Sequence, residues 1–249
     1  MKRKYESCIG KRIFGEIPEK PKHLSFCKTE IKRNFPIHNA SCCKLLLEME
    51  FEGGKLTFPV QAIIPEDEKL YGVIICFCSK NNTRYDEILT KSIQNGIALF
   101  TVDCENLAES NNDFKSGLAK QIVGSRRKRS SAGKIAIWTY IALRVKEVAL
   151  SMSEIGRKPI GIFGEGVFAL SALFSSMIDD DFSFVIAEDL PKIDHEMTLK
   201  MPYLFSPAYL ILDEVKADLD AKEFLKLSNE KATTIEDLIN DKLRQTTHF

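Results

Sequence analysis

The fold is decided by a twelve-residue stretch, Pro159-Ile160-Gly161-Ile162-Phe163-Gly164-Glu165-Gly166-Val167-Phe168-Ala169-Leu170. An apolar, partly β-branched run is interrupted by two closely spaced glycines, and an apolar segment without proline follows. This pattern predicts a buried strand over residues 159–163, a tight turn, and a helix over residues 167–177. A strand that passes directly into a helix is the building unit of sheets whose strands run parallel.

Strands and helices alternate on both sides of this unit. Strands are predicted over residues 45–51, 56–64, 72–78, 97–102, 159–163, 182–187 and 208–212, and helices over residues 83–94, 134–155, 167–177, 220–227 and 234–244. The first two strands flank Glu52-Gly53-Gly54-Lys55 and read as a β-hairpin. The order predicts one α/β domain over residues 44–249, with a doubly wound, mostly parallel sheet and helices on both faces.

Residues 1–43 carry basic side chains and the prolines Pro18, Pro21 and Pro36, so we expect an irregular basic arm. The net charge of zero conceals an asymmetry, since residues 1–33 hold 10 basic and 4 acidic groups whereas residues 179–249 hold 8 and 16. Arg126-Arg127-Lys128-Arg129 lacks interleaved aromatic residues, which favours a solvated loop over a nucleic-acid patch.

Composition favours a cytoplasmic protein without a membrane span. The longest apolar runs, residues 71–78 and 135–143, are shorter than the ~18 residues that a span needs. The charged start of the chain is not followed by a signal-peptide core. Seven cysteines and four histidines show no metal-ligand spacing, so we expect reduced thiols, no metal and no cofactor. The sequence identifies no partner and leaves a homo-oligomer open.

The glycine turn supports three interpretations. As Gly164-x-Gly166-x-x-Ala169 it is a dinucleotide fingerprint, and Glu188 or Asp189 then follows where a ribose-binding acid belongs. That fingerprint normally follows a first strand, whereas several predicted strands precede it here. As the elbow of an α/β-hydrolase, the turn has Gly166 at the position of the nucleophile. The third interpretation is a close-packed turn without a ligand.

Further segments carry a resemblance to a known family. They are Thr83-Arg84-Tyr85-Asp86-Glu87-Ile88 before Asn95-Gly96-Ile97-Ala98; Asn112-Asp113-Phe114-Lys115-Ser116-Gly117-Leu118-Ala119; Ala132-Gly133-Lys134-Ile135-Ala136-Ile137-Trp138 leading to Arg144; the glycine turn; and Ser206-Pro207-Ala208-Tyr209-Leu210 leading to Ala217-Asp218 and Glu223-Phe224. In this order they resemble bacterial α/β-hydrolases of the acetylxylan-esterase and glucuronoyl-esterase-like type. The resemblance covers about residues 45–226 and implies the α/β-hydrolase fold, shortened at its C-terminal end.

The resemblance implies loss of the catalytic residues at the elbow. The family motif reads Gly-His/Cys-Ser-Arg-x-Gly-Lys, and this chain has Gly164-Glu165-Gly166-Val167-Phe168-Ala169-Leu170. Gly166 stands in place of the serine, so no acyl-enzyme can form there. Val167 replaces the arginine that helps to stabilise the oxyanion, and Leu170 replaces the lysine. Loss of oxyanion donors alone typically costs ~10²–10³ in rate.

The remaining triad roles have weak candidates. Asp213, Glu214 and Asp218 follow the predicted strand over residues 208–212 and are the candidates for the acid. His195 precedes that strand and His248 lies beyond a predicted helix, so neither fits the histidine. We therefore predict a degenerate, non-catalytic α/β-hydrolase that binds a ligand or partner. The alternatives are a divergent, acetylxylan-esterase-like carboxylic-ester hydrolase and a dinucleotide-binding protein.

Overall fold

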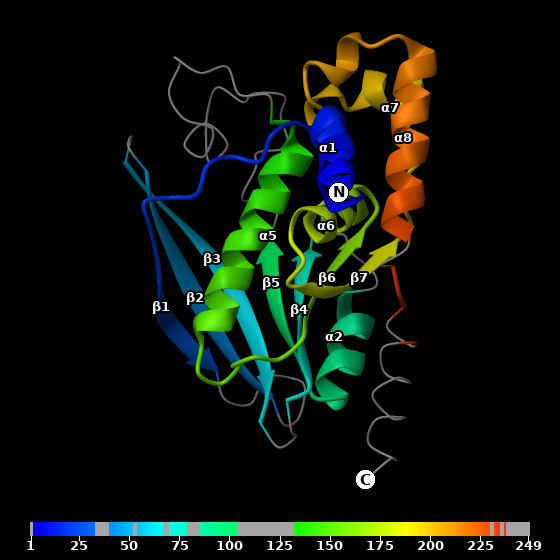
Figure 1. Cartoon of the computed structure of the whole chain (residues 1–249). Coiled ribbons are helices and arrows are strands. Elements are labelled where there is room, and N and C mark those ends of the chain that lie inside the picture. Colours follow the sequence, from blue (N-terminus) through cyan, green and yellow to red (C-terminus); the bar gives the residue numbers. More distant parts are fainter. Residues whose placement is uncertain are drawn as a thin grey trace.

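The computed structural model describes residues 2–32, 40–51, 54–66, 70–78, 85–103, 132–229, 232–234 and 237. The strands of these ranges form one seven-stranded sheet, flanked by helices (Figure 1). The strands are β1 (His23–Lys32), β2 (Ala40–Phe51), β3 (Gly54–Pro65), β4 (Gly72–Cys78), β5 (Ile97–Asp103), β6 (Ile160–Glu165) and β7 (Phe182–Glu188). The helices are α1 (Lys2–Phe14), α2 (Tyr85–Gln94), α5 (Lys134–Ser151), α6 (Val167–Ile178), α7 (His195–Lys200) and α8 (Glu214–Asn229), with 3-10 turns η1 (Pro202–Leu204) and η2 (Tyr209–Ile211).

The sheet is mixed and has a parallel core. Its order is β1-β2-β3-β5-β4-β6-β7. Strands β1, β2, β3 and β5 pair antiparallel in that order, whereas β5, β4, β6 and β7 pair parallel. The predicted hairpin is confirmed, since Phe51 at the end of β2 pairs with Gly54 at the start of β3. The α/β class predicted from the alternation of strands and helices is thus confirmed.

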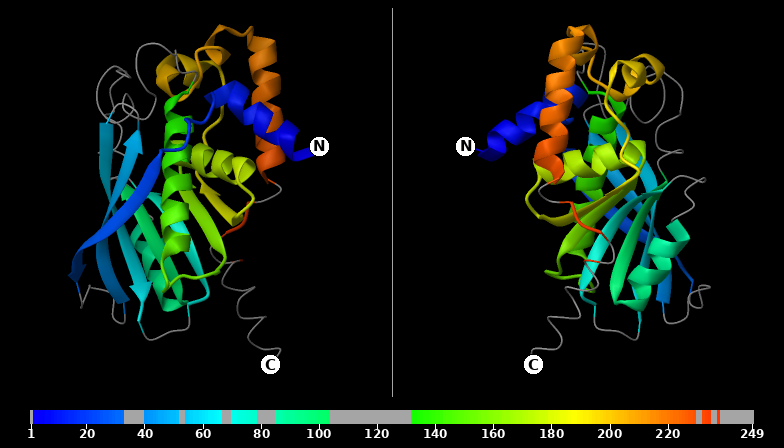
Figure 2. Two further views of the ribbon diagram at one scale, coloured as in Figure 1. Left: turned by 60° about the vertical axis from the view of Figure 1, so that its left-hand side comes forward. Right: turned by 90° about the vertical axis from the view of Figure 1, so that its right-hand side faces the viewer.

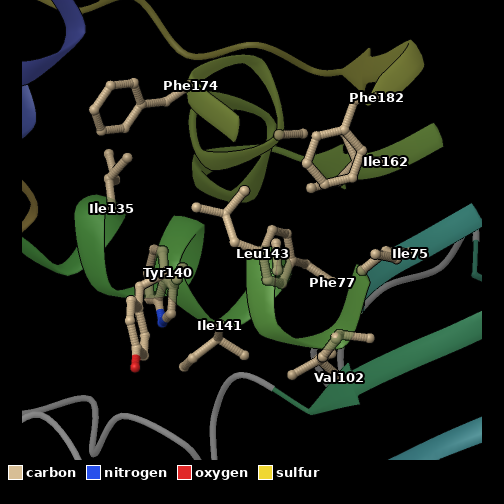
Figure 3. Packing of buried hydrophobic residues seen from close by; sticks show 14 of the residues in the cluster. Ile75, Phe77, Val102, Ile135, Tyr140, Ile141, Leu143, Ile162, Phe174 and Phe182 are labelled. Carbon is tan, nitrogen blue, oxygen red and sulfur yellow. The ribbon is translucent and has the colours of Figure 1, made fainter. Parts of the chain in front are cut away.

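Helices cover both faces of the parallel core, as predicted. On one face, Ile88, Leu89 and Ile93 of α2 pack on the row that includes Ile74 and Cys76 of β4. On the other face α5 and α6 cover the strands, and Figure 3 shows Phe77 and Val102 pointing from the sheet toward α5. Residues 73–77 of β4 are completely buried, because neighbouring strands flank β4 and helices cover both of its faces.

Helix α5 is buried on nearly all sides. The apolar spacing predicts a single buried stripe, yet Arg144 and Lys146, which lie off that stripe, are each only 3% exposed. Burial of Lys146 is compensated by ion pairs of its Nζ with Asp179 (2.6 Å) and Asp181 (2.7 Å). The Arg144 guanidinium lies 5.0 Å from the centre of the Tyr140 ring. Charged side chains can therefore be buried in this layer where each has a partner.

The prediction of an irregular arm over residues 1–43 is wrong, because α1 and β1 are regular elements. Strand β1 pairs with β2 along nearly its whole length and extends the sheet. Helix α1 buries Ile9, Ile13 and Phe14 completely. The Phe14 ring contacts those of Phe174 (5.4 Å), Phe205 (6.1 Å) and Phe224 (5.1 Å), measured between ring centres. The basic composition of residues 1–14 led to the prediction of an irregular arm, whereas Ile9, Ile13 and Phe14 form the apolar face of an amphipathic helix that packs on the core.

The predicted strand over residues 208–212 is also wrong. Residues 209–211 form the 3-10 turn η2, and α8 starts at Glu214. Ser206 Oγ donates a hydrogen bond to the Arg12 carbonyl (2.8 Å) and accepts one from the Tyr209 N–H (3.2 Å). These bonds hold the start of the apolar segment against α1, and the segment is not part of the sheet. At the outer edge of β7, Val185 instead forms an isolated parallel bridge with Ala232.

Two predicted segments lie outside the described residues. They are the cationic run at 126–129 and nearly all of the helix predicted over residues 234–244. Within the described ranges, no helix has the length and apolar character needed to cross a membrane.

Candidate functional site

The strand order places a topological switch point beside the glycine turn. From β4 the chain crosses through α2 to β5 on one side, and the later strand β6 pairs with the other side of β4. The order of the strands therefore runs from β4 to β5 on one side and from β6 to β7 on the other, and such a switch point is where open α/β sheets bind ligands. The turn after β6 is thus the candidate site.

Gly166 adopts the backbone of a sharp strand-to-helix elbow. Strand β6 ends at Glu165, and Gly166, with φ 57° and ψ −128°, caps the start of α6. This region of backbone space is accessible to glycine and strained for other residues. The Gly166 N–H donates to the Glu188 carbonyl (2.9 Å), and the Gly166 carbonyl accepts from the Ala169 N–H (3.0 Å). The predicted strand, turn and helix are confirmed.

The two glycines of the turn have different steric roles. A Cβ at Gly164 would lie 2.3 Å from the Phe168 carbonyl oxygen and 2.8 Å from the Ala169 nitrogen. Gly164 therefore permits α6 to start against the end of β6. A Cβ at Gly166 would meet no atom of the described residues within 4 Å. The position at which the resemblance implies the nucleophile consequently has room for a side chain and carries none.

The apolar side chains that follow Gly166 pack against the core and hold the elbow in place. The Phe168 ring lies 4.7 Å from that of Trp138 at the start of α5 and 6.1 Å from that of Phe77 at the end of β4, between centres. Leu170 is completely buried, and Val167 packs against the same core. The positions at which the resemblance implies an arginine and a lysine thus hold apolar side chains that pack on the core.

Carboxylates lie at the carboxyl ends of two adjacent strands, β6, which leads into the elbow, and β7. Glu165 of β6 is the register partner of Glu188 of β7. Register partners on adjacent parallel strands project from the same face of the sheet, about 5 Å apart. Both side chains are half-buried, and the exposed Asp189 follows with a positive φ of 47°. Sequence reasoning noted Glu188 and Asp189 as ribose-binding acids, but only the strand register identifies Glu165 as a neighbour of Glu188.

The predicted acid candidates lie at the start of α8. Asp213 Oδ1 accepts a hydrogen bond from the Lys216 N–H (2.9 Å), so it caps the helix. Glu214 is exposed on the first turn, and Asp218 lies 3.8 Å from Lys222. Among the interactions resolved within the described ranges, no hydrogen bond or ion pair joins these three carboxylates to residues 164–167. Their proposed role as a catalytic acid gains no geometric support.

The described part of the chain holds two histidines. His23 starts β1 at the far edge of the sheet, and His195 is exposed at the start of α7. Neither has a side-chain bond to a carboxylate in the described ranges. Those ranges also contain no group of three or more His, Cys, Asp or Glu residues positioned to hold a metal ion. His38 and His248 fall outside the described residues.

Comparison with protein-family models finds no match, and comparison with curated proteins finds none either. Solved structures do match. A glucuronoyl esterase from Solibacter usitatus superimposes with a TM-score of 0.74 and 13% identity, covering 88% of this chain and 68% of the esterase. A promiscuous CE15 esterase from a marine bacterial metagenome gives 0.69 and 12%, covering 87% and 67%. A CE15 glucuronoyl esterase from Teredinibacter turnerae gives 0.60 and 15%, covering 93% and 60%.

At such low identity these matches establish the fold, and they agree with the fold that the glycine turn predicts. The structures that this chain resembles are carboxylic-ester hydrolases, and it spans about two thirds of the length of the first of them. The chain therefore has the α/β-hydrolase-like fold that is found in CE15 glucuronoyl esterases.

Proposed function

We propose that this chain is an α/β-hydrolase-like protein without serine-esterase activity, in which the elbow serves as a structural turn of a binding scaffold. The observation that carries the proposal is Gly166. It has the backbone of an elbow, with φ 57° and ψ −128°, and open space where a nucleophilic side chain would stand. Without a hydroxyl or thiol at this point, the covalent route of ester hydrolysis has no attacking atom.

Electrostatics at the site also support the proposal. Ester hydrolysis builds up negative charge on the carbonyl oxygen, which esterases stabilise with hydrogen-bond donors and cations. Here the strand ends place Glu165 beside Glu188, and the neighbouring helix start holds Val167 and Leu170. Carboxylates oppose a developing anion and also disfavour uronate products, which carry a negative charge themselves.

A divergent ester hydrolase is the second candidate, and the similarity to esterase structures favours it. Such an enzyme would need another nucleophile. Cys76 is completely buried inside the sheet, and Ser206 Oγ is occupied by hydrogen bonds to α1 and η2. Neither is placed to replace the missing serine.

The dinucleotide interpretation has less support. In the fingerprint, backbone N–H groups at the start of the helix hold the phosphates. The Gly166 N–H is already bonded to the Glu188 carbonyl. We therefore expect calorimetric titration with NAD(H) or NADP(H) to give no saturable heat, and saturable binding abolished by Gly166→Ala would support the dinucleotide function instead.

The proposed function is tested by ester hydrolysis. Purified protein is assayed with p-nitrophenyl acetate and with a methyl ester of glucuronic acid, beside the Gly166→Ala variant. We expect both proteins to match the uncatalysed rate. We also expect no turnover from Gly166→Ser, because neither histidine of the described residues has a side-chain bond to a carboxylate, as the base of a triad would. Turnover by Gly166→Ser would show that a base and an oxyanion site are present. The chain would then have lost the nucleophile and kept the other catalytic groups, which contradicts a purely structural role of the elbow.

A further inference from the structure

The middle of α5 buries a guanidinium that has more hydrogen-bond donors than acceptors around it. Arg144 is only 3% exposed, although its side chain carries five N–H donors. Its Nη2 lies 3.0 Å from Glu147 Oε1, one turn further along the helix. Its Nε and Nη1 are also buried, and no described residue offers either of them an acceptor. Because buried donors without an acceptor are costly, they point to a bound acceptor.

A tyrosine hydroxyl adds another donor beside the guanidinium. Tyr140 precedes Arg144 by four residues, so both lie on the same side of α5, and the guanidinium carbon lies 5.0 Å from the centre of the ring. The hydroxyl donates to Met49 Sδ of β2 at 3.9 Å, and a thioether is a weak acceptor. Burial raises the pKa of Tyr140 to about 12. At neutral pH the hydroxyl therefore keeps its proton and cannot act as the counter-ion of Arg144.

The carboxylate that contacts Arg144 is shared with a second cation. Glu147 Oε1 lies 2.7 Å from Lys20 Nζ as well. Lys20 belongs to the link between α1 and β1, which passes across α5 in the left view of Figure 2. Lys20 is exposed and Glu147 is partly exposed, so the cluster reaches solvent at this end. Among these three charged groups, two cations face one carboxylate, and an excess of positive charge results.

We propose that the guanidinium of Arg144 and the hydroxyl of Tyr140 form a binding site for a monovalent halide anion between α5 and β2. An anion supplies acceptors only, and acceptors are what these donors lack. A water molecule would instead add two further donors to a cluster that is already rich in them. One negative charge also balances the excess that Arg144 and Lys20 leave over Glu147. The site is separate from the elbow and does not depend on the proposed function.

A halide bound at Arg144 stabilises the folded chain, because the unfolded chain has no such site. Once the halide concentration exceeds the dissociation constant, the equilibrium constant of unfolding falls about tenfold for each tenfold rise in concentration. Screening of surface charges depends on ionic strength alone. A larger anion at the same ionic strength therefore separates specific binding from screening.

Urea unfolding of the full chain in sodium chloride and in sodium gluconate, at matched ionic strength, tests the proposal. Gluconate is too large for an enclosed halide site and is the reference. We expect the wild-type chain to unfold at a higher urea concentration in chloride than in gluconate. Tyr140→Phe keeps the ring and removes the hydroxyl, and it should raise the chloride concentration of half-maximal effect about tenfold.

Two further variants separate binding from general stability. Tyr209→Phe is the matched control, because it also removes a buried hydroxyl, which donates to the Ala217 carbonyl in another part of the molecule. It should keep the chloride dependence of the wild type. Glu147→Gln removes the negative charge that competes with the anion for Arg144, so it should lower the chloride concentration of half-maximal effect. A purely structural role of Arg144 would not produce that shift.

Anomalous diffraction from crystals grown in sodium bromide locates the anion directly. We expect a bromide ion within hydrogen-bonding distance of Arg144 and Tyr140. Unfolding that is equal in chloride and gluconate would overturn the proposal, as would a chloride dependence that Tyr140→Phe leaves unchanged. Crystals in which a water molecule lies at Arg144 and bromide occurs only elsewhere would overturn it too.

Discussion

Replacement of Gly164 by alanine tests the steric basis of the elbow. The added Cβ would lie 2.3 Å from the Phe168 carbonyl oxygen, 2.5 Å from its carbon and 2.8 Å from the Ala169 nitrogen. All three atoms belong to the backbone, so no side-chain rotation relieves the overlap. The start of α6 must move away from β6 by about 1 Å to reach ordinary contact distances.

The cost follows from that overlap. Overpacking of a core costs about 1–3 kcal/mol when side chains can adjust, and we expect about 3 kcal/mol or more because backbone atoms are involved here. The Cβ of Gly166→Ala would meet no atom in the part of the chain that the structure describes, but it lies on a residue with φ 57°. That strain costs about 1–3 kcal/mol, of which up to about 1 kcal/mol is offset by the reduced entropy of the unfolded chain.

Urea unfolding followed by circular dichroism measures these differences from the transition midpoint and slope. Gly156→Ala is the matched control, because Gly156 also has a positive φ (59°) with open space around it but lies after α5, outside the elbow. We expect Gly164→Ala to be the least stable of the three variants. The steric reasoning fails if Gly164→Ala is as stable as Gly166→Ala or as the wild type.

Three further predictions concern the core and the ion pairs. Phe14→Ala should lower the free energy of unfolding by about 3–5 kcal/mol in the same urea experiment, because the ring is fully buried among three aromatic rings; a change near zero would mean that α1 does not belong to the core. Arg12→Ala should cost about 1–3 kcal/mol, since it leaves the buried Asp220 without its cation; an Asp220→Asn/Arg12→Ala double variant should recover part of that loss. The hydrogen bond from Lys146 lowers the pKa of Asp181, so the ionised carboxylate stabilises the fold above its unfolded pKa of about 3.9, and this contribution is lost as the pH falls through the folded pKa. Asp181→Asn should therefore be less stable than the wild type at neutral pH and equally stable in acid, and a difference independent of pH would contradict the assignment.

The elbow could be predicted from sequence because its requirements are local. Gly164 is needed where a helix starts against a strand, and Gly166 where the backbone has a positive φ, so both appear as glycines between apolar segments. The parallel core is similarly visible, because strands buried on both faces consist of unbroken apolar residues such as those of β4.

The remaining features depend on tertiary contacts. The segment Tyr209-Leu210-Ile211-Leu212 has the composition of a strand, yet hydrogen bonds from Ser206 to α1 and η2 fold it into a turn. Helix α1 is strongly basic, and only its contact with α6 and α8 reveals why Ile9 and Ile13 recur at a spacing of four. The pairing of Glu165 with Glu188 requires the strand register, which no local pattern encodes.

The central claim is that the elbow has no nucleophile, because a glycine occupies position 166. It is tested most directly by steady-state hydrolysis of p-nitrophenyl acetate and of the methyl glucuronate ester by the wild-type chain, with Gly166→Ala as the comparison. The account predicts that both proteins give the rate of buffer alone at every protein concentration. Turnover that saturates with substrate, increases in proportion to the wild-type protein and is lost in Gly166→Ala would contradict it.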